Sequence, residues 1–180
     1  MEKQALMSSE QMDRAIEKMA DAIAEVFKDQ DKIAIIGIRR HGVTVAKRIR
    51  ELLKLNIERE IPMGILDITM YRDDLERLER QPIVRSTQID FDINRCTVVL
   101  VDDVLYTGRT IRCALDQIVD YGRPKVVRLA VLVDRGLREL PIHADICGLQ
   151  VTTNPEQKVE VGFEGHDDQS GIWIISEKSK

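Results

Sequence analysis

The sequence has few of the features that would support a disulfide framework, a zinc site or a membrane span. Its three cysteines are far apart and none belongs to a CxxC pair, so we expect reduced thiols. Residues 1–10 are polar, and no apolar run approaches the roughly 18 residues needed to cross a bilayer. We therefore expect a cytoplasmic protein without a membrane partner.

Aromatic residues and positive charge are also scarce. Aromatic residues make up 4% of the chain and hydrophobic residues of all types 43%, so the core must be aliphatic, as in buried parallel strands. The formal net charge of -4 gives no general attraction to nucleic acid, and we expect no DNA partner. A length of 180 residues fits one domain, residues 1–180.

Apolar patterning predicts alternating strands and helices. Ser8 can cap a helix over about 9–28, where apolar residues recur at helical spacing. A second helical pattern follows the first strand and a third helix is expected over 110–121. Strands are expected at 33–36, 63–68, 97–101, 126–133, 146, 159–161 and 172–175. This order predicts an α/β fold with a mostly parallel sheet.

The stretch VVLVDDVLYTGRT, residues 98–110, carries the chemistry. Asp102 and Asp103 follow a predicted strand, and Thr107 and Gly108 lead into a helix whose first N–H groups favour a phosphate. Carboxylates repel a phosphate at contact, so we expect them to face a ribose diol and to stabilise positive charge on the sugar. A capped helix after a strand with solvated aspartates is the alternative, and the ordered combination of features argues against it.

This segment resembles the signature of type I phosphoribosyltransferases for 5-phosphoribosyl 1-pyrophosphate (PRPP). Together with residues 67–75 and 132–142 it resembles the bifunctional pyrimidine operon attenuator/uracil phosphoribosyltransferase family, over roughly residues 9–161. The resemblance implies a type I phosphoribosyltransferase fold, with a mostly parallel five-stranded sheet flanked by helices. It also implies a small hood formed mainly by about 137–180 and a flexible loop at about 70–95.

The resemblance implies that uracil and PRPP react to UMP and pyrophosphate in pyrimidine salvage, with Mg2+, in a homodimer or higher homo-oligomer. Catalytic roles then fall on Asp102, Asp103 and Arg72, and the two aspartates would contact Mg2+ through PRPP and water. The implied PRPP loop is Val104, Leu105, Tyr106, Thr107, Gly108, Arg109 and Thr110. The implied pyrophosphate contacts are Arg39, Arg40, His41 and Arg85, and the implied base contacts are Asp134, Arg135, Arg138 and Val159.

Two alternatives to a uracil enzyme stay open. One is a phosphoribosyltransferase for another base, because main-chain groups can recognise uracil and leave little trace in the sequence. The other is a regulator that senses PRPP or UMP and passes the signal to RNA. RNA binding needs a basic track, whereas the first predicted helix carries Glu17, Asp21 and Glu25. We therefore expect little or no RNA binding.

Overall fold

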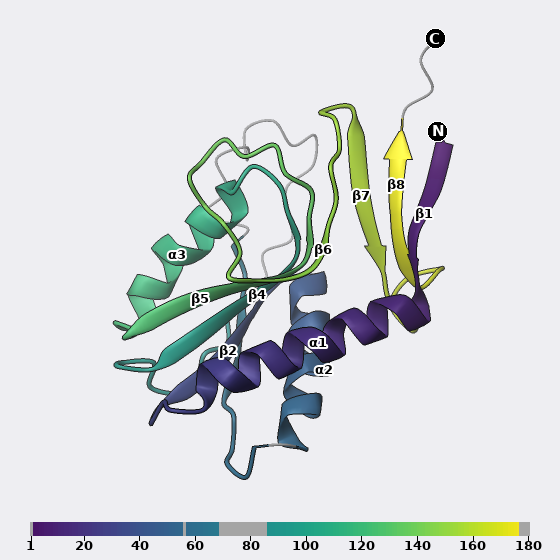
Figure 1. Ribbon diagram of the computed structural model, residues 1–180. Helices are drawn as coiled ribbons and strands as arrows, with labels where there is room; N and C mark the ends of the chain where they lie inside the picture. The colour runs from purple at the N-terminus through teal and green to yellow at the C-terminus, as the bar shows by residue number, and fades with distance from the viewer. Residues whose placement is uncertain (1, 56, 69–85, 177–180) are drawn as a thin grey trace.

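The protein folds into two sheets in a computed structural model that describes residues 2–55, 57–68 and 86–176. Arg72 and Arg85, with the larger part of the expected flexible loop, lie outside the described residues. The main sheet is parallel with the order β3-β2-β4-β5-β6, and the smaller sheet is antiparallel with the order β1-β8-β7 (Figure 1). The smaller sheet is called the hood below.

The described elements follow one another as strands and helices along the chain. They are β1 (Glu2–Ser8), α1 (Ser9–Phe27), β2 (Ile33–Ile38), α2 (His41–Lys54), β3 (Met63–Leu66), β4 (Thr97–Leu105), α3 (Arg109–Tyr121), β5 (Val126–Asp134), β6 (Ile146–Gln150), β7 (Gln157–Gly162) and β8 (Gly171–Ser176). None of the helices in this described part of the chain is long and apolar enough to span a membrane.

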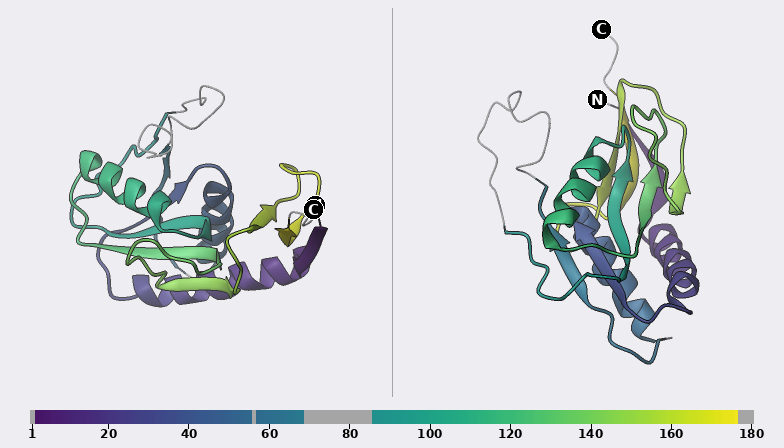
Figure 2. Two further views of the ribbon diagram at one scale, coloured as in Figure 1. Left: turned by 90° about the horizontal axis from the view of Figure 1, so that it is seen from above. Right: turned by 90° about the vertical axis from the view of Figure 1, so that its left-hand side faces the viewer.

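The main sheet lies between two helical layers, with α1 and α2 on one face and α3 on the other (Figure 2). Successive side chains of a strand point to opposite faces, so Val99 packs toward α1 and α2 while Val98 and Leu100 pack toward α3. Burial on both faces explains the continuous apolar runs of β2, β4 and β5. These runs predicted the strands from the sequence.

Helix α1 begins at the hood and runs across the main sheet (Figure 1). The Ser8 side chain accepts a hydrogen bond from the Gln11 amide at 3.3 Å, and the Gln11 side chain accepts one from the Ser8 amide at 2.9 Å. This capping box confirms the predicted start of the helix. Its buried stripe contains Met12, Ile16 and Met19, as the helical spacing predicted.

The hood differs from the expected segment at about 137–180 at both of its ends. Residues 2–8 form β1, which pairs with β8 from Glu2 opposite Ser176 to Ser8 opposite Gly171. The sequence did not predict this strand, because it lies at the edge of the hood with most of its side chains exposed and so has no apolar pattern. Residues 146–150 form β6, which is the edge strand of the main sheet beside β5.

The described end of the expected flexible loop, residues 86–95, is packed against the main body of the protein. Ile93 is fully buried in the cluster beneath α3. Gln88 pairs with Ile65 of β3 through two backbone hydrogen bonds of 2.8 Å. These contacts hold Gln88 against β3 and Ile93 beneath α3.

Candidate active site

The candidate site lies at the edge of the main sheet where β2, β4 and β5 end. Asp102 and Asp103 lie inside the last part of β4, because the strand continues to Leu105, beyond its predicted end. Gly42 of α2 packs directly against them, since a Cβ atom there would lie 2.7 Å from the Val101 carbonyl oxygen and 2.9 Å from the Asp102 Cα. Only glycine fits this approach, which brings the start of α2 against β4.

The two aspartates differ in burial and in charge. Asp102 is only 4% exposed, whereas about a quarter of the Asp103 side chain is exposed. Burial, together with the neighbouring Asp103 charge, raises the pKa of Asp102 well above its usual range. Burial also acts to raise the pKa of Asp103, but hydrogen bonds from His41 and Asp102 outweigh it and lower that pKa. The pair therefore holds its negative charge on Asp103.

His41, the first residue of α2, joins this pair to the hood. Its Nδ1 lies 3.4 Å from Asp103 Oδ2, and its Nε2 lies 3.3 Å from Asp167 Oδ2 in the connection between β7 and β8. The hydrogen bond with Asp103 raises the pKa of His41, and the charge of Asp167 adds to the effect. Sequence reasoning missed Asp167, because nothing in its irregular segment signals that it lies beside the PRPP motif.

The PRPP loop turns into α3 at Gly108, which has φ of 92° and is the N-cap residue. This left-handed conformation confirms why glycine is needed at this position. The Arg109 amide donates to the Thr107 hydroxyl at 3.3 Å, so Thr107 also supports the start of the helix. The first N–H groups of an α-helix have no partner within the helix, and such a terminus favours a bound anion, so the start of α3 is suited to a phosphate.

The predicted pyrophosphate loop connects β2 to α2 beside this terminus. The Arg39–Arg40 peptide bond is cis. Arg39 Nη2 donates to the Ser86 carbonyl at 3.2 Å, and its buried Nε has no hydrogen-bond partner among the described residues. Arg40 is exposed. Of these three residues, His41 lies beside Asp103, whereas the Arg39 side chain is directed toward Ser86.

Three of the four predicted base-contacting residues have their polar groups engaged inside the protein. Asp134 accepts from the Gly136 amide at 2.9 Å and forms an ion pair with Arg138. Arg135 donates to the Thr153 hydroxyl at 3.0 Å and lies over the Tyr106 ring at 4.0 Å. These contacts link the end of β5 to the PRPP loop.

The fourth predicted base contact, Val159, lies in a cavity of about 790 Å³ together with His41 and Asp103. The hood supplies the other wall of this cavity with Lys3, Glu160, Val161, Gly162, Asp167, Asp168, Gln169 and Trp173. Lys3 covers one side of the Trp173 ring, with its Nζ 4.0 Å from the ring centroid. The cavity therefore joins the carboxylate of the PRPP motif to a largely polar surface of the hood that also contains the Trp173 ring.

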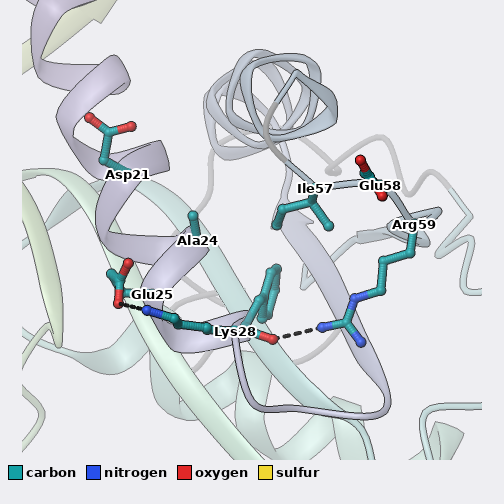
Figure 3. Close-up of a pocket in the computed structure, with 8 residues that line it drawn as sticks. Asp21, Ala24, Glu25, Lys28, Ile57, Glu58 and Arg59 are labelled. Atoms are coloured by element: carbon teal, nitrogen blue, oxygen red, sulfur yellow. Dashed lines mark hydrogen bonds and ion pairs between the residues drawn. The ribbon is translucent and has the colours of Figure 1, made fainter.

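A second cavity, of about 750 Å³, lies at the other end of α1 and contains none of the predicted site residues (Figure 3). Arg59 donates from Nη2 to the Phe27 carbonyl at 2.7 Å and from Nη1 to the Gln30 carbonyl, so it satisfies the C-terminal end of α1. Lys28 pairs with Glu25 at 3.6 Å. We assign this region a structural role.

Comparison with known proteins agrees with this geometry. Residues 5–167 match the phosphoribosyl transferase domain family. The chain is 47% identical to the bifunctional protein PyrR of Caldicellulosiruptor saccharolyticus over 94% of this chain and 93% of that protein. It is 51% identical to the bifunctional protein PyrR of Acetivibrio thermocellus over 89% and 87%. A hypoxanthine-guanine phosphoribosyltransferase from Bacillus anthracis has the same fold, with a TM-score of 0.72, 20% identity and coverage of 96% and 98%. The chain therefore belongs to the phosphoribosyl transferase domain family and, within it, to the family of the bifunctional PyrR proteins.

Proposed function

We propose that the protein transfers the phosphoribosyl group of PRPP to uracil and releases UMP and pyrophosphate. The observation that carries this proposal is the meeting of three features at one sheet edge. These are the carboxylate pair of β4, the start of α3 after the turn at Gly108, and the basic residues before α2. The choice of uracil rests on the resemblance of the sequence to the uracil-specific family.

In the proposed reaction, the bond between ribose C1′ and the pyrophosphate oxygen breaks and its electron pair leaves with pyrophosphate. A bond forms between C1′ and uracil N1, whose proton is released to water. The start of α3 binds the 5′-phosphate, while Asp102 and Asp103 bind the ribose hydroxyls. The charge of Asp103 stabilises the positive sugar in the transition state. Arg39, Arg40 and His41 bind the leaving pyrophosphate.

Mg2+ is proposed as the cofactor, carried by PRPP. The described residues contain no group of three His, Cys, Asp or Glu side chains that could hold a metal ion. Buried Asp102 is poorly suited to bind a metal directly, because burial raises the pKa of its carboxyl and so disfavours the charged form that a metal needs. Asp103 is partly exposed beside the cavity and can accept a hydrogen bond from a water molecule of a phosphate-bound Mg2+. The ion would neutralise charge on the leaving pyrophosphate.

The test is to incubate the protein with PRPP, Mg2+ and one base at a time, and to measure nucleotide and pyrophosphate by chromatography. We expect UMP from uracil, with pyrophosphate in equal amount. If only hypoxanthine or guanine gave product, the phosphoribosyl transfer would stand, but the substrate would be a purine base and not uracil. Absence of product with every base, while PRPP still binds, would favour a sensor that uses the same site.

A further inference from the structure

Three consecutive carbonyl groups of the PRPP loop are held by one segment, residues 135–140. The Leu105 carbonyl accepts from the Arg135 amide at 3.1 Å. The Tyr106 carbonyl accepts from Arg138 Nη1 at 2.6 Å. The Thr107 carbonyl accepts from the Glu139 and Leu140 amides at 3.0 and 3.1 Å.

These bonds determine which way the amides of the loop point. In a trans peptide the C=O of one residue and the N–H of the next are directed oppositely. Carbonyls turned toward residues 135–140 therefore leave the N–H groups of Tyr106, Thr107 and Gly108 directed away from that segment. A phosphate is attracted by N–H groups and repelled by carbonyl oxygens, so this orientation suits the loop to bind an anion. We call these N–H groups of Tyr106, Thr107 and Gly108, together with the start of α3, the phosphate cradle.

Arg138 is the only side chain among these donors, and its position is fixed by several acceptors. It donates from Nε to the Ile142 carbonyl at 2.9 Å and from Nη1 to the Gly136 carbonyl at 2.9 Å, and it forms an ion pair with Asp134. The side chain is 14% exposed. A planar guanidinium can satisfy these diverging acceptors together, whereas a lysine ammonium cannot.

The surrounding turn is shaped to present this side chain. Gly136 has φ of 72° and Leu137 has φ of 57°, so the chain reverses tightly after β5. Leu140 and Ile142 then pack against Gly108, where a Cβ atom would lie 3.3 and 3.4 Å from their Cβ atoms. The segment after β5 thus contacts the PRPP loop from behind, on the side opposite the cradle.

We propose that Arg138 is a positioning residue for the 5′-phosphate, which acts through the Tyr106 carbonyl rather than by contact with the base. The inference rests on the proposed function, because the phosphate is that of PRPP. It differs from the base contact that sequence resemblance assigned to Arg138. Loss of the guanidinium frees the Tyr106 peptide to rotate, and its carbonyl can then face the phosphate.

The test is the Arg138→Lys variant, with the Michaelis constants for PRPP and uracil measured separately. We expect the constant for PRPP to rise about tenfold, as for the loss of one charge-assisted hydrogen bond. The constant for uracil should change less than about twofold, within ordinary variation of a remote substitution. Arg128→Lys is the matched control, because Arg128 also lies in an aspartate pair, with Asp145 at 2.9 Å, at the start of β5. It should leave both constants unchanged.

A rise for uracil alone, or equal rises for both substrates, would overturn the inference in favour of a base contact or a general loss of structure. Asp134→Asn provides a second variant if Arg138→Lys does not fold, because it weakens the anchor of Arg138 and keeps the guanidinium. It should raise the constant for PRPP in the same direction. Calorimetry with PRPP separates the two proposals. Wild-type protein that does not bind PRPP overturns both, whereas normal binding by the wild type and by both variants overturns only this inference.

Discussion

At the residue scale, Asp102 and Asp103 are neighbours in one strand with different tasks. Asp102 packs beneath Gly42, and the pKa of its carboxyl is raised by burial. Asp103 faces the cavity and keeps its charge because His41 donates to it. The sequence predicted the pair but placed both residues after the end of the strand, whereas they lie within β4. An acidic residue gives no sequence signal of burial, so the inner position of Asp102 had to come from the structure.

Asparagine substitutions test this division. Asp103→Asn removes the charge near the ribose, and we expect kcat with uracil and PRPP to fall about a hundredfold, as for loss of one electrostatic group in an active site. Asp102→Asn alters a buried carboxyl whose raised pKa already disfavours the charged form, so kcat should fall less. Both variants should keep a cooperative thermal transition. If both variants kept the wild-type kcat, the proposed role of the pair would be contradicted. Asp116→Asn, on the exposed face of α3, serves as the control.

His41 gives a pH dependence of stability. The pKa of His41 is raised in the folded state, chiefly by the hydrogen bond with Asp103, with Asp167 adding to the effect and with burial and, less strongly, Arg40 opposing it. A raised pKa means that the stabilisation is fully present below the unfolded value of about 6.5 and is lost as pH rises through the folded pKa. We expect His41→Gln to lower the melting temperature by a few degrees at pH 6 and hardly at pH 9. A loss of the same size at both pH values would show that His41 acts through packing against Phe163 instead.

At the scale of elements, the sequence predicted the strands and helices whose burial leaves a clear apolar pattern, either a continuous run or a helical stripe. Strands β2, β4 and β5 are buried on both faces and α1 has one buried stripe, so their apolar patterns were clear. The edge strand β1 has no such pattern because its side chains are mostly exposed. The contacts of Arg135 and Arg138 with the PRPP loop depend on tertiary structure between distant elements, which periodicity does not report.

The start of α3 allows a test of the phosphate cradle. Thr107→Val removes a hydroxyl that can donate a hydrogen bond to the 5′-phosphate. The same hydroxyl accepts a hydrogen bond from the Arg109 amide at 3.3 Å. We expect the Michaelis constant for PRPP to rise several-fold, because an apolar group now crowds the cradle. Thr97→Val is the control, since Thr97 begins β4 at the end away from the PRPP loop and its hydroxyl donates to the Gln30 side chain at 2.9 Å. Unchanged PRPP affinity of the Thr107 variant by calorimetry would place the phosphate elsewhere.

At the scale of the whole molecule, apolar side chains remain on the surface away from the site. Val119 is 72% exposed on α3 and Leu55 is 80% exposed after α2. We expect at least a dimer, because the family resemblance implies one and association would remove such side chains from water. Sedimentation velocity across the micromolar range measures the mass. A monomer at every concentration would contradict this expectation.

The surface charge leads to the prediction that RNA binds weakly if at all. Asp13, Glu17, Asp21 and Glu25 recur every fourth residue of α1, and all four are exposed. Arg135 and Arg138, two of the cations near the proposed site, have their guanidinium groups engaged inside the protein. Fewer cations are thus available for a phosphate backbone than the sequence suggested, and phosphate contacts dominate RNA affinity.

Gel-shift titration with a pyrimidine-operon leader RNA at low salt, with and without UMP, measures this directly. We expect no shift in the nanomolar range in either condition. The combined Glu17→Lys, Asp21→Lys and Glu25→Lys variant should bind the same RNA more tightly than the wild type, and with a steeper dependence on salt, because each new cation neutralises a phosphate. Tight wild-type binding that UMP strengthens would contradict the prediction. It would mean that RNA approaches a surface other than the face of α1 that carries Glu17, Asp21 and Glu25, since those carboxylates repel phosphates.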